Sequence, residues 1–367
     1  MKILFKPQTE WLPPEEFKDL SSYDEIAIDL ETKDPELKTM GSGSVTGKGE
    51  IVGIALAVDG WSAYYPIAHE GGGNMDRKKV MDYFRTILNY PSKKIFHNAM
   101  YDVCFIRAEG LKINGEVVDT MIAGSLVNEN RFRYDLGSMG RDYLGKGKNE
   151  AVLTETAKEW GIDPKSEMYK LPAMYVGEYA EQDADLTYKL WQEMKKQMYH
   201  EDVEDIFKLE TELFPCLVDM RFLGVRVDTQ AAYILKQQLV EEEKECLQKV
   251  KTETSVDVQI WAARSIERVF QKLNLPYDLT AKTRSPSFTK NFLQNHPHPM
   301  VKLIARAREI NKSHTTFIDT ILKHQHKGRI HAEINQIRSD SGGTVTGRFS
   351  YNNPNLQQIP ARNKELG

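Results

Sequence analysis

Short apolar runs in the first third of the chain predict a β-sheet. These runs are rich in Ile, Val, Ala and aromatic residues and lie at residues 25–30, 51–58 and 61–67. Asp59-Gly60 between the last two is typical of a hairpin turn. Ile95-Phe96 predicts a further strand, and a helical pattern at residues 76–88 precedes it. Strands mixed with helices in this way indicate an α/β domain.

Helical periodicity dominates the second half of the chain. One apolar stripe runs through residues 229–251, and Asp228 just before it is a predicted helix N-cap. A second stripe runs through residues 300–323. We expect these two long helices to pack against each other in antiparallel orientation.

The charge of the chain is unevenly distributed. The formal net charge is only −4, but from residue 281 onward there are 14 Lys and Arg against 5 Asp and Glu, and six of the nine His. A basic segment of this kind attracts a phosphate backbone in a salt-dependent manner. The chain has no apolar run of 18 residues, so no membrane partner is predicted, and its three widely spaced cysteines are typical of a reducing cytoplasm.

Four acidic residues follow predicted elements in a way that could bring them to one point. Asp29 and Glu31 are two apart at the end of a strand, so their side chains share one face. Asp102 comes where the strand at Ile95 turns into a helix. Asp183 lies on a helix, four residues after Tyr179 and therefore on the same helix face.

Clustered carboxylates repel one another unless a cation neutralises them. Oxygen ligands select hard ions, so the set predicts two divalent metal ions, Mg²⁺ or Mn²⁺. Such a pair supports phosphodiester hydrolysis. Each acid alone is usually a surface or capping residue, and only the ordered set favours a metal site. The ordinary phenol pKa, about 10, makes Tyr179 a better orienting group than a general base.

Three segments resemble the three motifs of the proofreading 3′→5′ exonucleases that carry a tyrosine in the last motif. The segments are Asp29-Leu30-Glu31-Thr32, His97-Asn98-Ala99-Met100-Tyr101-Asp102 and Tyr179-Ala180-Glu181-Gln182-Asp183. A sister branch has histidine at the position of Glu178. The resemblance implies a ribonuclease-H-like exonuclease fold with a mixed sheet flanked by helices.

The resemblance also implies roles for the motif residues. Asp29 would bridge both metals, Glu31 and Asp183 would complete the tighter site, and Asp102 would serve the looser one. Tyr179 would join these four in catalysis. Thr32, His97 and Asn98 would contact the DNA strand, and the position of His97 matches a substrate-contacting residue of the family rather than a general base.

A second resemblance lies near the C-terminus. Residues 346–350, residues 353–360 and Arg362 resemble the template-primer-binding segment at the start of the palm of family A DNA polymerases, the bacterial polymerase I type. Residues 209–228 resemble the segment that leads from the exonuclease into the thumb of these enzymes. The resemblance implies that four side chains contact primer or template, those of Arg348, Asn355, Gln357 and Gln358. They would bind the acceptors that every base pair presents in the minor groove.

These resemblances imply an exonuclease domain at residues 1–200, a mainly helical thumb at 201–330 and a partial palm at 331–367. The partners implied are a single-stranded DNA 3′ end and primer-template DNA, in the cytoplasm of a phage-infected bacterium. The chain stops before the palm carboxylates of a family A polymerase. A 3′→5′ DNA exonuclease is therefore the first hypothesis. The alternatives are a DNA-binding subunit that completes a split polymerase with a separate C-terminal polypeptide, and an RNA-trimming exonuclease of the ribonuclease D type.

Overall fold

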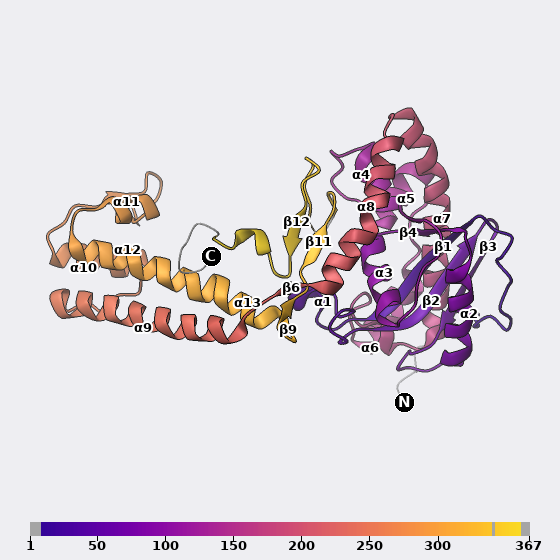
Figure 1. Ribbon diagram of the computed structural model, residues 1–367, viewed down its shortest axis with the longest axis horizontal. Coiled ribbons are helices and arrows are strands. Elements are labelled where there is room, and N and C mark those ends of the chain that lie inside the picture. The colour runs from indigo at the N-terminus through magenta and orange to yellow at the C-terminus, as the bar shows by residue number, and fades with distance from the viewer. Residues whose placement is uncertain (1–8, 340–341, 361–367) are drawn as a thin grey trace. The chain divides into compact units, whose positions relative to one another are not determined.

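A five-stranded mixed sheet forms the centre of the N-terminal unit in the structure, a computed structural model that describes residues 9–339 and 342–360 (Figure 1). The strands are β1 (Glu25–Lys33), β2 (Glu50–Val58), β3 (Trp61–Pro66), β4 (Lys93–Phe96) and β5 (Val117–Asp119). Their order is β3-β2-β1-β4-β5, with antiparallel pairs on the β3 side of β1 and parallel pairs on the β5 side. The predicted strands, the hairpin at Asp59-Gly60 and the mixed sheet are confirmed.

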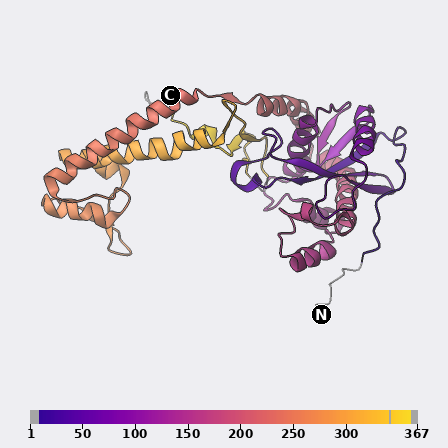
Figure 2. The same ribbon diagram turned by 90° about the horizontal axis from the view of Figure 1, so that it is seen from below.

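Helices cover both faces of this sheet (Figures 1 and 2). The helices of this unit are α1 (Leu37–Met40), α2 (Arg77–Asn89), α3 (Ala99–Ala108), α4 (Thr120–Val127), α5 (Leu136–Leu144), α6 (Ala151–Trp160), α7 (Gly177–His200) and α8 (Glu204–Leu223). Two 3-10 turns, η1 (Met168–Lys170) and η2 (Ala173–Tyr175), precede α7. The predicted helix near residue 76 is α2, and Asp76 caps it by accepting from the backbone N–H of Lys79.

Alternate side chains of β1 point into two different hydrophobic cores. Ile26, Ile28 and Leu30 point to the face covered by α2 and α3. Ala27 points to the opposite face, where it packs in a second core with α4, α5 and α7. Side chains two apart on a strand share a face, so Asp29 and Glu31 also point toward α7. The strand pattern thus decides which helix can complete the acidic cluster.

The second unit, which contains residues 225–330, is mainly helical, and a mainly helical thumb was predicted at residues 201–330. Its helices are α9 (Thr229–Thr254), α10 (Ala263–Lys272), α11 (Lys290–Asn295), α12 (Pro299–Lys312), the π-helical turn η3 (Ser313–Ile318) and α13 (Asp319–His324). Its short strands are β6 (Val225–Arg226), β7 (Asp278–Leu279), β8 (Pro286–Ser287), β9 (Gln325–His326) and β10 (Arg329–Ile330). The predicted N-cap is confirmed, because Asp228 accepts from the backbone N–H of Ala231.

The two long helices of this unit lie side by side and antiparallel, as predicted (Figures 1 and 2). Apolar side chains of α9 and α12, including Leu239, Val250 and Ile304, are buried in one shared core. The guanidinium of Arg308 donates to the backbone carbonyls of Ile260 and Phe288 and so ties α12 to the segments beyond α9.

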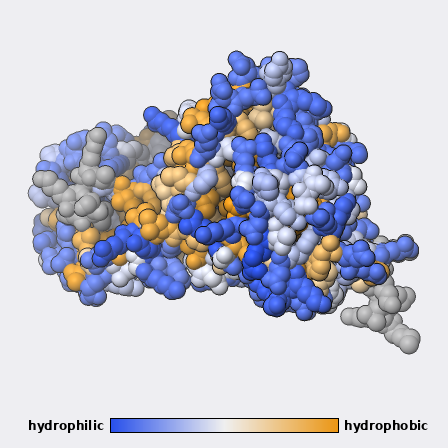
Figure 3. Space-filling model, turned by 45° about the vertical axis from the view of Figure 1, so that its right-hand side comes forward, coloured by the Kyte–Doolittle hydropathy of each residue, from blue (hydrophilic) through white to orange (hydrophobic). Residues whose placement is uncertain are grey.

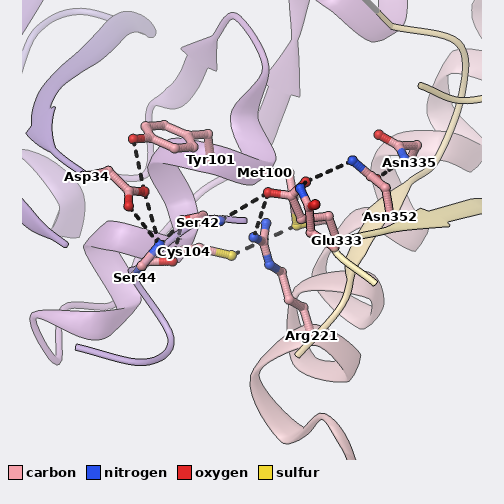
Figure 4. A network of polar contacts seen from close by, with 12 residues as sticks. Asp34, Ser42, Ser44, Met100, Tyr101, Cys104, Arg221, Glu333, Asn335 and Asn352 are labelled. Atoms are coloured by element: carbon pink, nitrogen blue, oxygen red, sulfur yellow. Dashed lines mark hydrogen bonds and ion pairs between the residues drawn. The ribbon is translucent and has the colours of Figure 1, made fainter. Parts of the chain in front are cut away.

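Residues 331–339 and 342–357 return to the N-terminal unit, as β11 (Glu333–Asn335), β12 (Ser350–Asn352) and most of the 3-10 turn η4 (Leu356–Gln358). Figure 4 shows the polar network that holds β11 there. The Glu333 carboxylate accepts from the backbone N–H of Ser42 and from the Asn352 side chain, and it pairs with the buried guanidinium of Arg221 at 3.5 Å. The loop that contains Ser42 is fixed in turn by Asp34, which accepts from the N–H of Gly43.

Packing divides the described chain differently from the expected functional domains. Residues 9–224 with 331–339 and 342–357 form one unit, and residues 225–330 with 358–360 form the other. The domain limits at 200 and 330 stay predictions. No helix within the described ranges is both long and apolar enough to cross a membrane.

Lys94 on β4 provides a test of the first unit's stability. Its side chain is fully buried, and its ammonium donates to the carbonyls of Tyr90, Ser92 and Asn114. Replacing it with Met leaves these acceptors without their donor, so we expect Lys94→Met to lower the free energy of unfolding by about 2–3 kcal/mol. Urea denaturation measures this loss. The control is Lys93→Met, which removes an ion pair with Glu116 at the surface and should cost less than about 1 kcal/mol. An equal effect of both substitutions would contradict the argument.

Candidate active site

Three of the four predicted acids meet between the sheet and helix α7. Asp29 and Glu31 come from β1 and Asp183 from α7, and one ligand oxygen from each lies within 4.8 Å of the others. Glu31 and Asp183 are buried, and Asp29 is half-buried. The predicted convergence of these three positions is therefore present in the structure.

Small residues allow α7 to approach the acids. The cross-strand neighbours of Asp29 and Glu31 on β2 are Ala55 and Gly53. A Cβ on Gly53 would lie 2.0 Å from the Tyr64 hydroxyl, so no larger residue fits there without moving that ring. On the helix side, Ala180 and Ala184 are buried in the same core. The backbones of α7 and β1 can therefore approach each other closely at these positions.

Asp102 lies in the first turn of α3, as predicted, and is buried. Its Oδ1 accepts from the backbone N–H of Leu30, at 3.1 Å, between the two acids of β1. Burial raises the pKa of Asp102, and the charge of Asp29 raises it further. Asp102 is outside the compact group of three but is electrostatically coupled to it, which fits a ligand of a second cation.

The carboxylates of this cluster are costly to ionise without a cation. Burial and then Asp183 raise the pKa of Asp29 to about 7. Burial is also the first cause of the raised pKa of Glu31 and of Asp183. Within the described residues, the buried Oδ1 of Asp183 has no hydrogen-bond donor. A group of buried anions with an oxygen lacking a donor fits a site for divalent metal ions.

Tyr179 lies one helical turn before Asp183, as predicted. Burial and the charge of Asp183 raise the pKa of its phenol well above the usual value. The phenol therefore stays protonated at neutral pH, as an O–H that can donate a hydrogen bond. This state suits an orienting group and excludes Tyr179 as the base.

Lys148 is a site residue that the sequence did not reveal. It belongs to the loop between α5 and α6, and its ammonium lies 2.5 Å from Oδ2 of Asp183 and 3.3 Å from the Tyr179 hydroxyl. Its spacing from the three motifs carries no signal. The chain offers the similar Lys146 two residues earlier, so only the folded structure distinguishes them.

Asn98 is exposed and adopts a left-handed backbone conformation, with φ of 67°. Asp119 holds it there by accepting from the backbone N–H groups of Asn98 and Ala99. The same carboxylate caps α4 by accepting from the N–H of Met121. Asp119 was also missed, although its position just before a helix is typical of an N-cap and could have identified it.

His97 and Thr32 each lie within hydrogen-bond distance of a neighbouring hydroxyl group. Nδ1 of His97 lies 2.8 Å from the Thr120 hydroxyl, and burial lowers the pKa of His97 to about 3, with a further contribution from Lys148. The imidazole is therefore neutral at neutral pH and a poor base. The Thr32 hydroxyl lies 2.7 Å from that of Tyr101.

The four side chains expected to contact primer or template, those of Arg348, Asn355, Gln357 and Gln358, are all exposed. The Gln357 side chain donates to the carbonyl of Phe349, and Asn355 accepts from the N–H of Gln357, so the turn is fixed locally. Arg362 of the same motif lies outside the described residues.

Known protein families match both parts of the chain. A family model described as 3′-5′ exonuclease matches residues 6–199, and one described as DNA polymerase family A matches residues 229–366. The chain is 32% identical to a DNA-directed DNA polymerase of Pseudomonas phage M6, over 97% of this chain and 56% of the relative. It is 29% identical to DNA polymerase DpoZ of Acinetobacter phage SH-Ab 15497, over 95% of this chain and 58% of the relative.

A bacterial relative and a solved structure extend the comparison. DNA polymerase I of Chloroflexus aurantiacus is 25% identical over 86% of this chain and 34% of the relative. The polymerase domain of Pol1 from M. smegmatis, solved with DNA primer-template and dNTP, has the same fold, with a TM-score of 0.69 and 18% identity over 94% of this chain and 54% of that one. The chain spans a little over half the length of the phage relatives. It belongs to the 3′-5′ exonuclease family, whose model matches residues 6–199, and the segment at residues 229–366 is similar to DNA polymerase family A.

Proposed function

We propose that this chain is a metal-dependent 3′→5′ DNA exonuclease of the proofreading type, releasing nucleoside monophosphates. The observation that carries the proposal is the meeting of Asp29, Glu31 and Asp183 within 4.8 Å, with Asp102 beside β1. These four carboxylates would hold two divalent ions. When bound, such ions supply activation of a water molecule and stabilisation of charge on the phosphate and leaving oxygen.

The other residues of the site would position the attacking water and the DNA strand. Tyr179, protonated and one turn from Asp183, would donate a hydrogen bond that positions the attacking water. Asp119 fixes the backbone at Asn98, so the Asn98 amide is held at the surface where a DNA strand can bind. Thr32 and the neutral His97 would contact the same strand. Arg348, Asn355, Gln357 and Gln358 are exposed and would bind primer-template DNA.

The first test is degradation of DNA. A 5′-labelled single strand incubated with the chain and Mg²⁺ should shorten from its 3′ end. Asp29→Ala should reduce the rate by at least about a hundredfold, because it removes a ligand of both metals. Asp24→Ala, an exposed acid just before β1, should leave the rate unchanged. Full-length DNA after incubation with the unaltered chain would reject the proposal, and faster degradation of a matched RNA would favour the ribonuclease D alternative.

The raised pKa values predict an unusual pH dependence of stability. A carboxyl with a folded pKa above its unfolded value holds a proton in the folded protein that the unfolded chain has released. Stability of the metal-free protein should therefore fall as pH rises from about 4 to about 7, the window set by Asp29. Thermal unfolding in EDTA should show this decrease. Asp29→Asn cannot ionise at this position, so its melting temperature should depend less on pH, and an unchanged slope would contradict the assignment.

We also propose a second role, as the part of a DNA polymerase that binds the remaining polymerase segment, supplied by a separate C-terminal polypeptide. Hydrophobic side chains gather in patches on the face drawn in Figure 3. Helix α8 has an apolar stripe at alternating spacings of three and four, made by Ile206, Leu209, Leu213, Cys216, Met220 and Leu223. Leu209 is 56% and Leu223 65% exposed. The phage relatives extend well beyond the matched region, and their additional segment is a suitable partner for this face.

Co-purification tests this second role. The chain should bind a polypeptide that corresponds to the remaining part of the phage relatives, and mixing the two should restore DNA synthesis. Leu209→Glu combined with Met220→Glu should abolish binding while nuclease activity persists, because both side chains are exposed and remote in sequence from the acids. Tyr199→Glu, an exposed aromatic residue at the end of α7, is the matched control. Binding that survives the double substitution would exclude α8 as the contact surface.

A further inference from the structure

We propose that Lys148 is a built-in counter-ion of the active site, which neutralises Asp183 in the metal-free protein and must be displaced when a divalent ion binds there. The inference deepens the proposed exonuclease function and rests on it. It assigns a role to a residue outside the three acidic motifs.

The position of Lys148 is that of a cation within the cluster. Its ammonium contacts Oδ2 of Asp183, while Oδ1 of the same carboxylate is buried and has no donor among the described residues. The charges of Asp29 and Glu31 also act on this ammonium. The lysine thus occupies one carboxylate oxygen of Asp183, and the other oxygen has no donor among the described residues.

The Lys148 ammonium is largely shielded from water. The Lys148 side chain is 19% exposed and that of Asp183 only 4%. The attraction between two opposite charges is much stronger in such a setting than at the surface. A divalent ion that binds Asp183 must therefore displace the Lys148 ammonium. Its double charge attracts the carboxylate more strongly than the single charge of the ammonium does.

The backbone that carries Lys148 is anchored, so the side chain rather than the loop has to move. The N–H of Asn149 donates to the side chain of Gln182 on α7, at 2.8 Å. On the other side, a Cβ on Gly140 would lie only 2.7 Å from the carbonyl oxygen of Lys146, so the loop packs directly on α5. The ammonium also lies 5.2 Å from the centre of the Tyr179 ring, which offers it a neighbouring position after displacement.

The proposal predicts opposite effects on the metal-free and metal-bound protein. Lys148→Met removes the competing cation, so Mn²⁺ should bind at least about tenfold more tightly. The same substitution leaves the carboxylates without a counter-ion, so the melting temperature in EDTA should fall. Addition of Mn²⁺ should then raise the melting temperature more than in the unaltered chain. Calorimetric titration with MnCl₂ and thermal unfolding measure these effects without any nuclease assay.

Two further variants distinguish the effect of the Lys148 charge from an effect on folding. Lys146→Met makes the same change at an exposed position of the same loop and should alter neither Mn²⁺ affinity nor melting temperature. Lys148→Arg keeps the positive charge and should bind Mn²⁺ with an affinity nearer to that of the unaltered chain. A Lys148→Met protein that reaches the unaltered melting temperature in Mn²⁺ is correctly folded.

Equal or weaker Mn²⁺ affinity in Lys148→Met would overturn the counter-ion role and leave the exonuclease proposal intact. Absence of Mn²⁺ binding by the unaltered chain would instead overturn the metal-dependent function, and the role of Lys148 with it. The two failures are therefore distinguishable in one set of titrations.

Discussion

The close contact between helix α7 and strand β1 is the constraint on which the site depends. It brings Asp183 to Asp29 and Glu31, although like charges on facing elements repel each other. The energy that holds them together comes from the apolar packing around them, in which Ala27, Ala180 and Ala184 are buried. Small side chains on both elements shorten the distance between the backbones. The same contact therefore builds the core and concentrates a group of acidic side chains in one place.

That group of anions explains the character of its neighbours. The acids have raised pKa values because they are buried. Burial, together with the charges of these acids, also raises the pKa of the nearby phenols of Tyr64 and Tyr179 and keeps them protonated. A lysine reaches in from a loop and makes the shortest contact with Asp183. Each of these features follows from concentrating negative charge in a place that water reaches poorly.

The polymerase-like part of the chain is not packed as one block. The chain leaves the N-terminal unit at residue 224 and returns to it at residue 331, so the helical unit is an insertion between α8 and β11. Arg221 on α8 and Glu333 on β11 form a buried ion pair across this insertion. Their interaction fixes β11, which precedes the predicted primer-binding turn, to the unit that contains the acidic cluster. Domain limits given as consecutive residue ranges cannot describe a unit that is made of two separate segments of the chain.

The sequence by itself determined the first four strands of the sheet, the long helices, the cap at Asp228 and the set of acids, because these depend on local periodicity and short-range hydrogen bonds. The resemblance of the motifs also indicated the family. Only the tertiary structure decided that Lys148 rather than Lys146 contacts Asp183, that Asp119 holds Asn98, and that residues 331–339 and 342–357 pack with the N-terminal unit. These contacts join positions that are distant along the chain, and side-chain charge or spacing does not encode which of several similar residues the folded backbone brings together.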